Sequence, residues 1–294
     1  MSSGPRLLIT GAAGQVGAHL VDTAGGGGAV TALDRAALDV TSYDEVRRAV
    51  AAHRPDVVIN AAAFTAVDRA ETAEAAAFAV NRDGAETVAL ACAEAGAALV
   101  HLSTDYVFDG RKGEPYVETD PVSPLNVYGA SKAAGESAVR EALERHVIVR
   151  TAWVFSERPP NFVRTILRLA AEREVLEVVD DQRGHPTWAG DVARACLTIA
   201  RRLADGDDVA GTVHYAGAPS TTWHGLAEAV VEAARERGGV RVRRVEPVPT
   251  SAMPRPAPRP PCVELDGSRA ESIFGLSMPD WKRRVGLVVG GASG

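Results

Sequence analysis

Short apolar runs and longer helical patterns alternate along the first half of the chain. The apolar runs, each ending in small or polar residues, lie at 6–10, 30–34, 56–60, 98–103 and 147–151. Between them apolar residues recur at helical spacing, as in 73–95. Strands that alternate with helices form parallel sheets, so this half predicts an α/β fold with a doubly wound parallel Rossmann sheet.

The pattern becomes less regular after residue 150. We expect a dinucleotide-binding Rossmann domain at 1–150 and a smaller, discontinuous α/β substrate-binding lobe formed by 151–189 and 205–287. A helical pattern at 190–204 is expected to rejoin the first domain. Residues 288–294 are glycine-rich and predict a disordered tail.

Charge and composition exclude several classes of function. The formal net charge of −6 disfavours a general nucleic-acid binder, because phosphate neutralisation requires a basic face. No apolar run approaches the ~18 residues of a membrane span, and the N-terminus lacks a signal-peptide pattern. Cys92, Cys196 and Cys262 show no metal-ligand spacing. We therefore expect a cytoplasmic protein without a structural metal.

A glycine pattern follows the first predicted strand. Gly11-Ala-Ala-Gly14-Gln-Val-Gly17 joins that strand to a helix, as a dinucleotide site requires for its pyrophosphate. Asp34 ends the second strand 23 positions after Gly11, where an acid can bind the adenosine ribose of NADH. Arg35 could instead accept the 2′-phosphate of NADPH, and the sequence leaves both cofactors open.

Polar and small residues also follow the third and fourth strands. Ala61–Thr65 leaves room for a ribose or nicotinamide beside the backbone. Ser103 and Thr104 end the fourth strand, where they can donate hydrogen bonds to a substrate carbonyl. The alternative for Thr104 is a capping hydroxyl, and Asp39 fits a turn as well as it fits an adenine contact.

Tyr128 and Lys132 are the candidates for acid–base chemistry. They stand four residues apart, which places both side chains on one face of a helix. A tyrosine hydroxyl has a pKa of about 10 and is a poor acid at neutral pH. We expect the Lys132 ammonium to favour the phenolate and so lower the pKa of Tyr128.

In combination, these motifs resemble those of the extended short-chain dehydrogenase/reductases. Longer motifs resemble the dTDP-4-dehydrorhamnose reductase family, and they lie at 60–71, 103–110, 124–132, 150–154, 180–187, 221–224 and 248–256. The resemblance implies that NADPH or NADH reduces the C4 keto group of dTDP-4-dehydro-L-rhamnose, a dTDP-4-keto-6-deoxyhexose, to dTDP-L-rhamnose. Alternatives are a reductase of a related nucleotide-deoxysugar in antibiotic biosynthesis, such as a dihydrostreptose-type sugar, and a non-catalytic regulatory subunit that binds nucleotide.

The resemblance also implies roles for single residues. Tyr128 would donate the proton, Lys132 would bind the nicotinamide ribose and Thr104 would bind the reacting oxygen. Asp105 and Trp153 would reach the dTDP-sugar. The cofactor contacts implied by the resemblance are Gly14, Gln15, Val16, Asp34, Asp39, Val40, Ala63, Phe64, Thr65 and Leu102, besides Tyr128 and Lys132. The glycine pattern adds Gly11 and Gly17, and the charge beside Asp34 adds Arg35.

Two further implications concern metal and assembly. Some members of the family use Mg²⁺ at a dimer interface, so the resemblance allows a homodimer. Gly190 stands where one of the metal-binding carboxylates is expected, and no Mg²⁺ ligands are therefore carried over to this chain. Position 64 is often His or Tyr in the family and is Phe here, which removes a polar contact.

Overall fold

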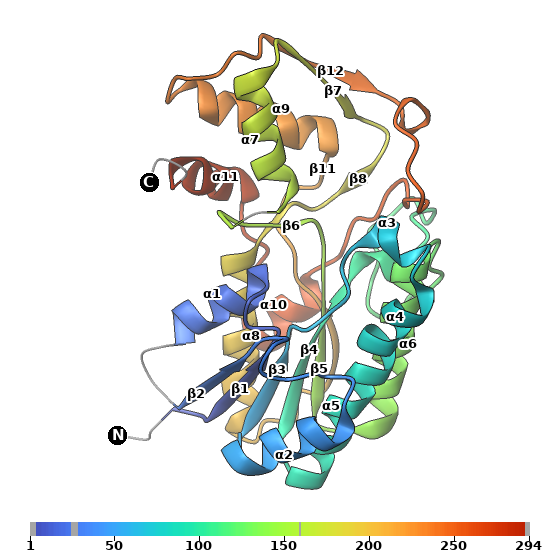
Figure 1. Ribbon diagram of the computed structural model, residues 1–294, viewed down its shortest axis with the longest axis vertical. Coiled ribbons are helices and arrows are strands. Elements are labelled where there is room, and N and C mark those ends of the chain that lie inside the picture. Colours follow the sequence, from blue (N-terminus) through green and yellow to red (C-terminus); the bar gives the residue numbers. More distant parts are fainter. Residues whose placement is uncertain (1–3, 25–28, 159, 292–294) are drawn as a thin grey trace.

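A six-stranded parallel sheet forms the centre of the larger part of the molecule (Figure 1). The computed structural model describes residues 4–24, 29–158 and 160–291. The strands are β1 (Leu7–Thr10), β2 (Val30–Leu33), β3 (Val57–Asn60), β4 (Ala98–Thr104), β5 (His146–Thr151) and β10 (Gly211–His214). Their order is β2-β1-β3-β4-β5-β10, and every neighbouring pair is parallel. The predicted α/β fold with a doubly wound sheet is confirmed.

Helices cover both faces of this sheet. The helices on one face are α2 (Tyr43–His53), α5 (Gly84–Ala95) and α6 (Val127–Ala142), and those on the other are α1 (Gln15–Ala24) and α8 (Ala189–Ala204). Each face of the sheet has its own apolar core, and the side chains of β1 point alternately into the two. Leu8 packs in the core under α2 and α5, whereas Leu7 and Ile9 pack in the core under α8. Because both faces are covered, most strand residues are apolar.

The helix predicted over 73–95 is interrupted. It divides into α4 (Glu74–Phe78), a π-helical turn, η1 (Ala79–Asp83), and α5. The π turn contains the buried Asn81, whose side chain accepts from Phe64 N (2.8 Å) and donates to Phe64 O (3.1 Å). The extra residue in the turn thus directs an amide that fixes the loop after β3.

A smaller unit lies above the carboxyl edge of the large sheet (Figure 1). Its helices are α7 (Phe162–Glu172), α9 (Trp223–Arg235) and α11 (Trp281–Gly290), which share one apolar core. Its strand pairs are β7 (Val175–Val179) with β12 (Arg244–Val248), β6 (Val154–Phe155) with β9 (Thr187–Trp188), and β8 (Arg183–Gly184) with β11 (Thr221–Thr222). The remaining short elements are α3 (Val67–Ala70), η2 (Asp105–Val107), η3 (Thr250–Ala252) and α10 (Ser268–Phe274).

Three segments differ from the boundaries that we expected. β10 and α10 fall within 205–287, yet β10 pairs with β5, and Ala270 and Phe274 of α10 pack in the core of the large sheet. The predicted tail at 288–294 is wrong for 288–290, which complete α11 with two buried valines. Residues 292–294 lie outside the described residues. Within the described parts of the chain, no helix has the length and apolarity needed to cross a membrane.

A buried ion pair joins α6 to the sheet. Glu136 on α6 is fully buried, and its Oε1 accepts from Ser103 Oγ (2.6 Å) and from Arg150 Nε (2.9 Å). Its Oε2 accepts from Arg150 Nη2 (2.7 Å) and from Arg140 Nη2 (2.8 Å). Ser103 belongs to β4 and Arg150 to β5. One carboxylate therefore fixes the position of α6 relative to two strand ends.

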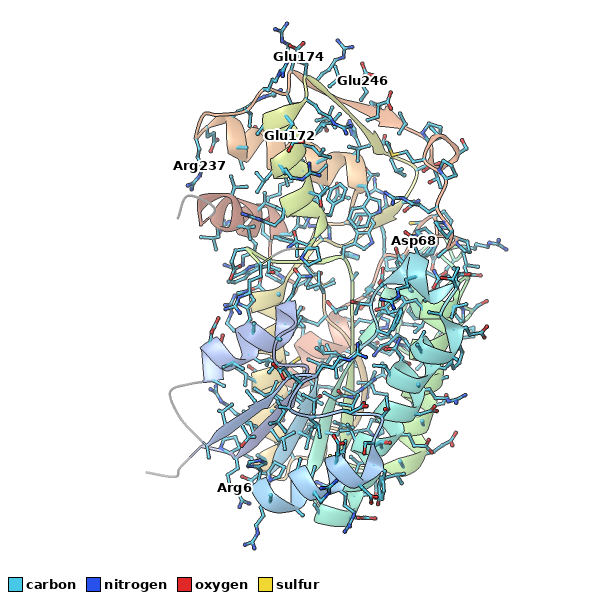
Figure 2. All side chains as sticks on the ribbon, in the orientation of Figure 1. Arg6, Asp68, Glu172, Glu174, Arg237 and Glu246 are labelled. Atoms are coloured by element: carbon cyan, nitrogen blue, oxygen red, sulfur yellow. The ribbon has the colours of Figure 1, made fainter. Side chains whose placement is uncertain are left out.

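Replacing this carboxylate is expected to destabilise the fold. Glu136→Gln keeps the shape but leaves the buried Arg150 guanidinium without its counter-charge, and the free energy of unfolding should fall by about 3–5 kcal/mol. Denaturant titration measures the change. The control is Glu172→Gln on α7 (Figure 2), because Glu172 pairs with Arg168 in an exposed i,i+4 bridge worth less than ~1 kcal/mol. Equal losses in both variants would contradict a special role for Glu136.

Candidate active site

A cavity of about 610 Å³ lies at the carboxyl edge of the large sheet, where the two units meet. Its walls contain most of the predicted site residues: Gly14, Gln15, Val16, Gly17, Ala63, Thr65, Leu102, Thr104, Asp105, Tyr128, Lys132 and Trp153. The strand order reverses between β1 and β3, and ligands of open α/β sheets bind at such a point. Topology and cavity therefore indicate the same place for a ligand.

The glycine pattern brings the first turn of α1 close to the strand end. Gly11 has a φ of +67°, and a Cβ on Gly17 would lie 2.2 Å from Gly11 O. Larger side chains at these two positions are thus excluded. Gln15, the first residue of α1, accepts from Asn161 Nδ2 (3.1 Å) and Ser156 Oγ (2.8 Å), both in the 153–162 connection that leads into the smaller unit. This helix N-terminus suits an anionic group.

Six predicted cofactor residues lie outside the cavity: Gly11, Asp34, Arg35, Asp39, Val40 and Phe64. Asp34 Oδ1 accepts from Ala36 N (2.9 Å) and Ala37 N (3.0 Å), which holds the carboxylate just beyond β2. Arg35 beside it is exposed. The side chains at this end of the site are consistent with a ribose or phosphate contact, and these roles stay predictions.

The other residues outside the cavity have local roles. Asp39 Oδ1 accepts from Thr41 N (3.0 Å) and Thr41 Oγ1 (2.8 Å), and these hydrogen bonds lower the pKa of Asp39. Asp39 thus closes a turn, while an adenine contact stays a prediction. Val40 is buried in the core under α2 and α5, so any contact with a cofactor would come from its backbone. Phe64 is held through its backbone by Asn81.

Thr104 and Asp105 form the end of β4. Thr104 Oγ1 caps η2 by accepting from Tyr106 N (3.2 Å), and it donates to Asp105 Oδ1 (2.9 Å). Thr104 thus caps η2 and also lines the cavity, and its hydrogen bond to a substrate carbonyl stays a prediction. Asp105 is 2% exposed, and burial raises its pKa to about 7, with the Thr104 hydrogen bond acting in the opposite direction. This carboxyl group changes its charge near neutral pH.

Tyr128 lies in the first turn of α6, which Asn126 caps by accepting from Gly129 N (2.8 Å). Its ring meets the Tyr106 ring edge-on, with centroids 5.9 Å apart. A Cβ on Gly129 would lie 2.1 Å from Tyr106 O, so only glycine lets α6 approach η2 this closely. Burial raises the pKa of Tyr128 to about 12, opposed by the Thr104 hydroxyl. We expected Lys132 to lower the pKa of Tyr128. This prediction is wrong, because burial shifts that pKa in the opposite direction.

Lys132 lies one turn further along α6 and is 2% exposed. Its Nζ donates to Leu102 O (2.7 Å) on β4. Burial lowers the pKa of Lys132 to about 8, and the Glu136 carboxylate opposes this shift. The ammonium is thus the main form below about pH 8 and the neutral amine is readily formed above it.

Sequence reasoning assigns no individual role to several cavity residues: Ala66, Val67, Tyr106, Thr151, Ala152, Val154, Pro160, Asn161 and Trp223. Most of them lie within the family-like motifs at 60–71, 103–110, 150–154 and 221–224. Thr151 is the last residue of β5 and residues 152–154 follow it, so the carboxyl-edge rule that drew attention to Thr104 at the end of β4 applies to them equally. Trp223 lines the cavity and stacks on Trp153, with the ring centroids 3.6 Å apart. Nothing in the sequence around Trp223 indicates this contact.

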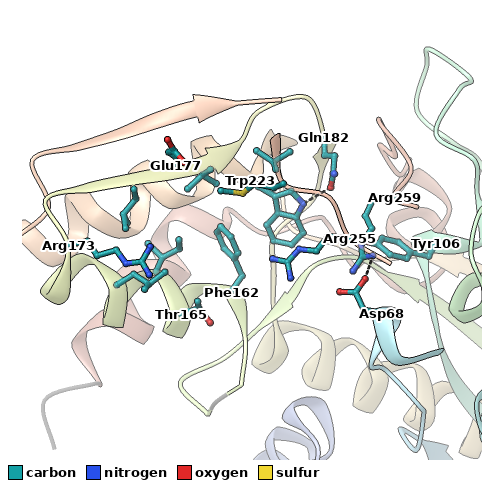
Figure 3. Close-up of a pocket in the computed structure, with 16 residues that line it drawn as sticks. Asp68, Tyr106, Phe162, Thr165, Arg173, Glu177, Gln182, Trp223, Arg255 and Arg259 are labelled. Carbon is teal, nitrogen blue, oxygen red and sulfur yellow. Dashed lines mark hydrogen bonds and ion pairs between the residues drawn. The ribbon is translucent and has the colours of Figure 1, made fainter. Parts of the chain in front are cut away.

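A second cavity of about 440 Å³ continues from the first into the smaller unit (Figure 3). The two share Tyr106 and Trp223. Arg255 and Arg259 point into this region, and Arg259 Nη1 pairs with Asp68 Oδ1 at 2.5 Å. Its apolar floor consists of Ile166, Leu169, Leu176, Val178 and Val179, and the charged Arg173 and Glu177 also line the cavity. The cavity thus combines cationic side chains with an apolar floor.

The residues around position 190 do not fit a magnesium site. A Cβ on Gly190 would lie 2.5 Å from the Trp188 ring, so the backbone there leaves no space for a carboxylate. The neighbouring Asp191 is buried and pairs with Arg194 and Arg284. Among the described residues, no cluster of three or more His, Cys, Asp or Glu side chains could hold a metal ion.

Comparison with known proteins gives consistent matches over the whole chain. The family model described as RmlD substrate binding domain matches residues 5–292. The dTDP-4-dehydrorhamnose reductase of Burkholderia thailandensis is 45% identical, with 97% of this chain and 98% of the relative covered. That of Streptomyces griseus is 46% identical, with 95% and 91% covered.

The fold comparison agrees with the sequence comparison. The crystal structure of the Bacillus anthracis dTDP-4-dehydrorhamnose reductase in complex with NADP has a TM-score of 0.89 and 35% sequence identity, with 96% of this chain and 97% of that chain covered. Motifs, cavity and full-length similarity therefore lead to one conclusion: the chain belongs to the dTDP-4-dehydrorhamnose reductase family.

Proposed function

We propose that the chain catalyses the NADPH- or NADH-dependent reduction of the C4 keto group of dTDP-4-dehydro-L-rhamnose to dTDP-L-rhamnose. The observation that carries the proposal is the convergence of Thr104, Tyr128 and Lys132 on one cavity that also contains the glycine pattern. A hydroxyl, a phenol and an ammonium beside a nucleotide site are the groups that carbonyl reduction requires. The relatives that are 45% and 46% identical to this chain are dTDP-4-dehydrorhamnose reductases.

The protein's contribution is position and charge. A bound reduced nicotinamide supplies the hydride. The phenol of Tyr128 stays protonated across neutral pH, because its pKa is about 12, and it donates that proton to the oxygen that gains charge. The Thr104 hydroxyl orients the same oxygen, and the Lys132 ammonium stabilises the phenolate that forms.

We assign the cofactor to the larger unit and the sugar nucleotide to the space between the units. The α1 N-terminus with Gly14 and Gln15 suits the pyrophosphate of the cofactor. The second cavity suits the nucleotide part of the substrate, since Arg255 and Arg259 match a diphosphate and the apolar floor matches a base (Figure 3). Asp105 and Trp153 lie toward the sugar in this arrangement.

Cofactor choice and assembly complete the proposal. The Bacillus anthracis relative binds NADP, and the exposed Arg35 is suited to a 2′-phosphate, whereas the Asp34 carboxylate suits the free hydroxyl of NADH. We therefore expect both cofactors to be accepted. The three free cysteines fit a cytoplasmic setting. The family resemblance allows a homodimer, and light scattering measures the oligomeric state.

The Tyr128→Phe substitution tests the proposed function. The wild-type protein is expected to oxidise NADPH or NADH in the presence of dTDP-4-dehydro-L-rhamnose, followed by nicotinamide absorbance. Tyr128→Phe keeps the ring and removes the transferable proton, so kcat should fall at least ~100-fold while NADPH affinity is kept. Near-normal turnover in this variant would remove Tyr128 from the mechanism. Cofactor binding without turnover in the wild type would favour another deoxysugar or a regulatory subunit.

Asp105→Asn tests the burial of charge at the substrate end. The pKa of Asp105 is raised by burial to about 7, so the folded chain loses stability as pH rises from about 4, the pKa of a free carboxyl group, to about 7. The Asn variant should be more stable than the wild type by about 1–3 kcal/mol at pH 8, and the gain should vanish by about pH 4. Thermal unfolding at several pH values measures this. Asp208→Asn, at an exposed position, should show no such trend; a similar trend there would contradict the explanation.

A further inference from the structure

A row of polar side chains crosses the otherwise apolar sheet. Thr10 on β1 pairs in register with Asn60 on β3, which pairs with His101 on β4. The row two residues earlier on the same face is apolar, formed by Leu8, Val58 and Leu99. Lys132 of α6 continues the polar row, with its Nζ 3.4 Å from His101 Nε2. The row thus ends at a residue of the candidate active site.

Every member of this row is buried. Thr10 is 1% exposed, Asn60 2%, His101 1% and Lys132 2%. Burying such groups is unfavourable unless each finds a hydrogen-bond partner, and apolar side chains would complete the sheet more favourably. The row therefore calls for a role beyond packing.

The hydrogen bonds determine which way the Asn60 amide points. Its Oδ1 accepts from Thr10 Oγ1 (2.6 Å) and from Ala62 N (3.2 Å). Because a backbone N–H can only donate, the oxygen must be on this side. The Asn60 NH₂ group then faces His101 Nδ1 at 3.2 Å and donates to it.

This arrangement selects one tautomer of His101. A neutral imidazole whose Nδ1 accepts carries its hydrogen on Nε2, the nitrogen that faces Lys132. The charged and titratable groups around the ring are Lys132 and Arg140 on α6 and His146 on β5. Together with burial they hold the pKa of His101 well below its ordinary value, so the ring stays neutral.

We propose that His101 is a positioning residue for Lys132, whose Nε2–H stabilises the neutral amine that Lys132 becomes during the reaction. The inference rests on the proposed function. Tyr128 gives its proton to the substrate oxygen and becomes a phenolate. The Lys132 ammonium then returns one proton to the phenolate, and the resulting amine accepts a hydrogen bond from His101. Solvent restores the proton to Lys132.

The surroundings of Lys132 balance its two forms. Leu102 O and the Glu136 carboxylate favour the ammonium, whereas the His101 N–H and burial favour the amine. Tyr128 lies one turn away on the same helix, and the Asp105 charge adds to burial in raising the pKa of Tyr128. Within this set, His101 is the group whose hydrogen is placed by a neighbour on another strand, Asn60.

NMR of protein carrying isotope-labelled histidine tests the tautomer without turnover. His101, assigned by comparison with a His101→Leu variant, should be neutral and carry its hydrogen on Nε2 between about pH 6 and pH 9. A hydrogen on Nδ1, or a charged ring in this range, would overturn the proposal. The tautomer is observed in the wild-type chain, and the variant serves only to assign the signal.

Asn60→Asp tests the functional consequence. The substitution keeps the acceptor for Thr10 and Ala62 but replaces the donor to His101 Nδ1 by an acceptor. His101 should then carry its hydrogen on Nδ1 and accept from the Lys132 ammonium. In the wild type, kcat/KM is expected to decline at high pH with a midpoint near pH 8, and we call this decline the alkaline limb. In Asn60→Asp the limb should move up by about one pH unit, and kcat should fall about tenfold.

Two controls separate the route through His101 from a general effect. The first control adds Asn60→Asp to a His101→Leu variant, where the limb should no longer move by this amount. A double-mutant cycle measures the difference. His146→Leu replaces another buried histidine, on β5, whose Nδ1 lies against Leu143 O, and it should leave the limb in place. An unchanged limb in Asn60→Asp, or an equal shift in both backgrounds, would overturn the proposal. Absence of turnover in the wild type would instead overturn the proposed function and, with it, this step.

Discussion

The arrangement of the site depends on the buried pair of Glu136 and Arg150. The Glu136 carboxylate receives hydrogen bonds from β4, from β5 and from its own helix, and it lies one turn beyond Lys132. A buried charge must be fully partnered, and this one is satisfied only when α6 and both strand ends occupy one relative position. The distances among Thr104, Tyr128 and Lys132 are therefore set by an electrostatic constraint outside the cavity.

Burial then sets the chemistry of the groups that face the cavity. It raises the pKa of Tyr128 and of Asp105 and lowers that of Lys132, because in each case the charged form loses hydration. The tyrosine is thus an acid that keeps its proton until charge develops on a neighbouring oxygen. The sequence spacing of Tyr128 and Lys132 predicted their shared helix face, but the direction of the pKa shift depends on burial, which spacing does not contain.

Features with local rules were the predictable ones. Buried strands are apolar, and this rule predicted the strand runs that form the sheet. The carboxyl-edge rule predicted the places of the glycine pattern and of Thr104, both of which line the cavity. Features that rest on contacts between distant segments were not predictable. β10 has the same short apolar pattern as a strand of the smaller unit, and only its pairing with β5 assigns it. The π turn at Asn81 and the stacking of Trp153 on Trp223 likewise depend on tertiary partners.

In the proposed reaction, hydride reaches C4 of the sugar in this cavity while the protein supplies the proton. Its most direct test uses reduced nicotinamide with deuterium at the transferred position and dTDP-4-dehydro-L-rhamnose, with NMR of the isolated product. We predict deuterium at C4 of a dTDP-L-rhamnose product and none elsewhere on the sugar. Nicotinamide oxidation with no deuterium at C4, or deuterium at another carbon, would contradict the account.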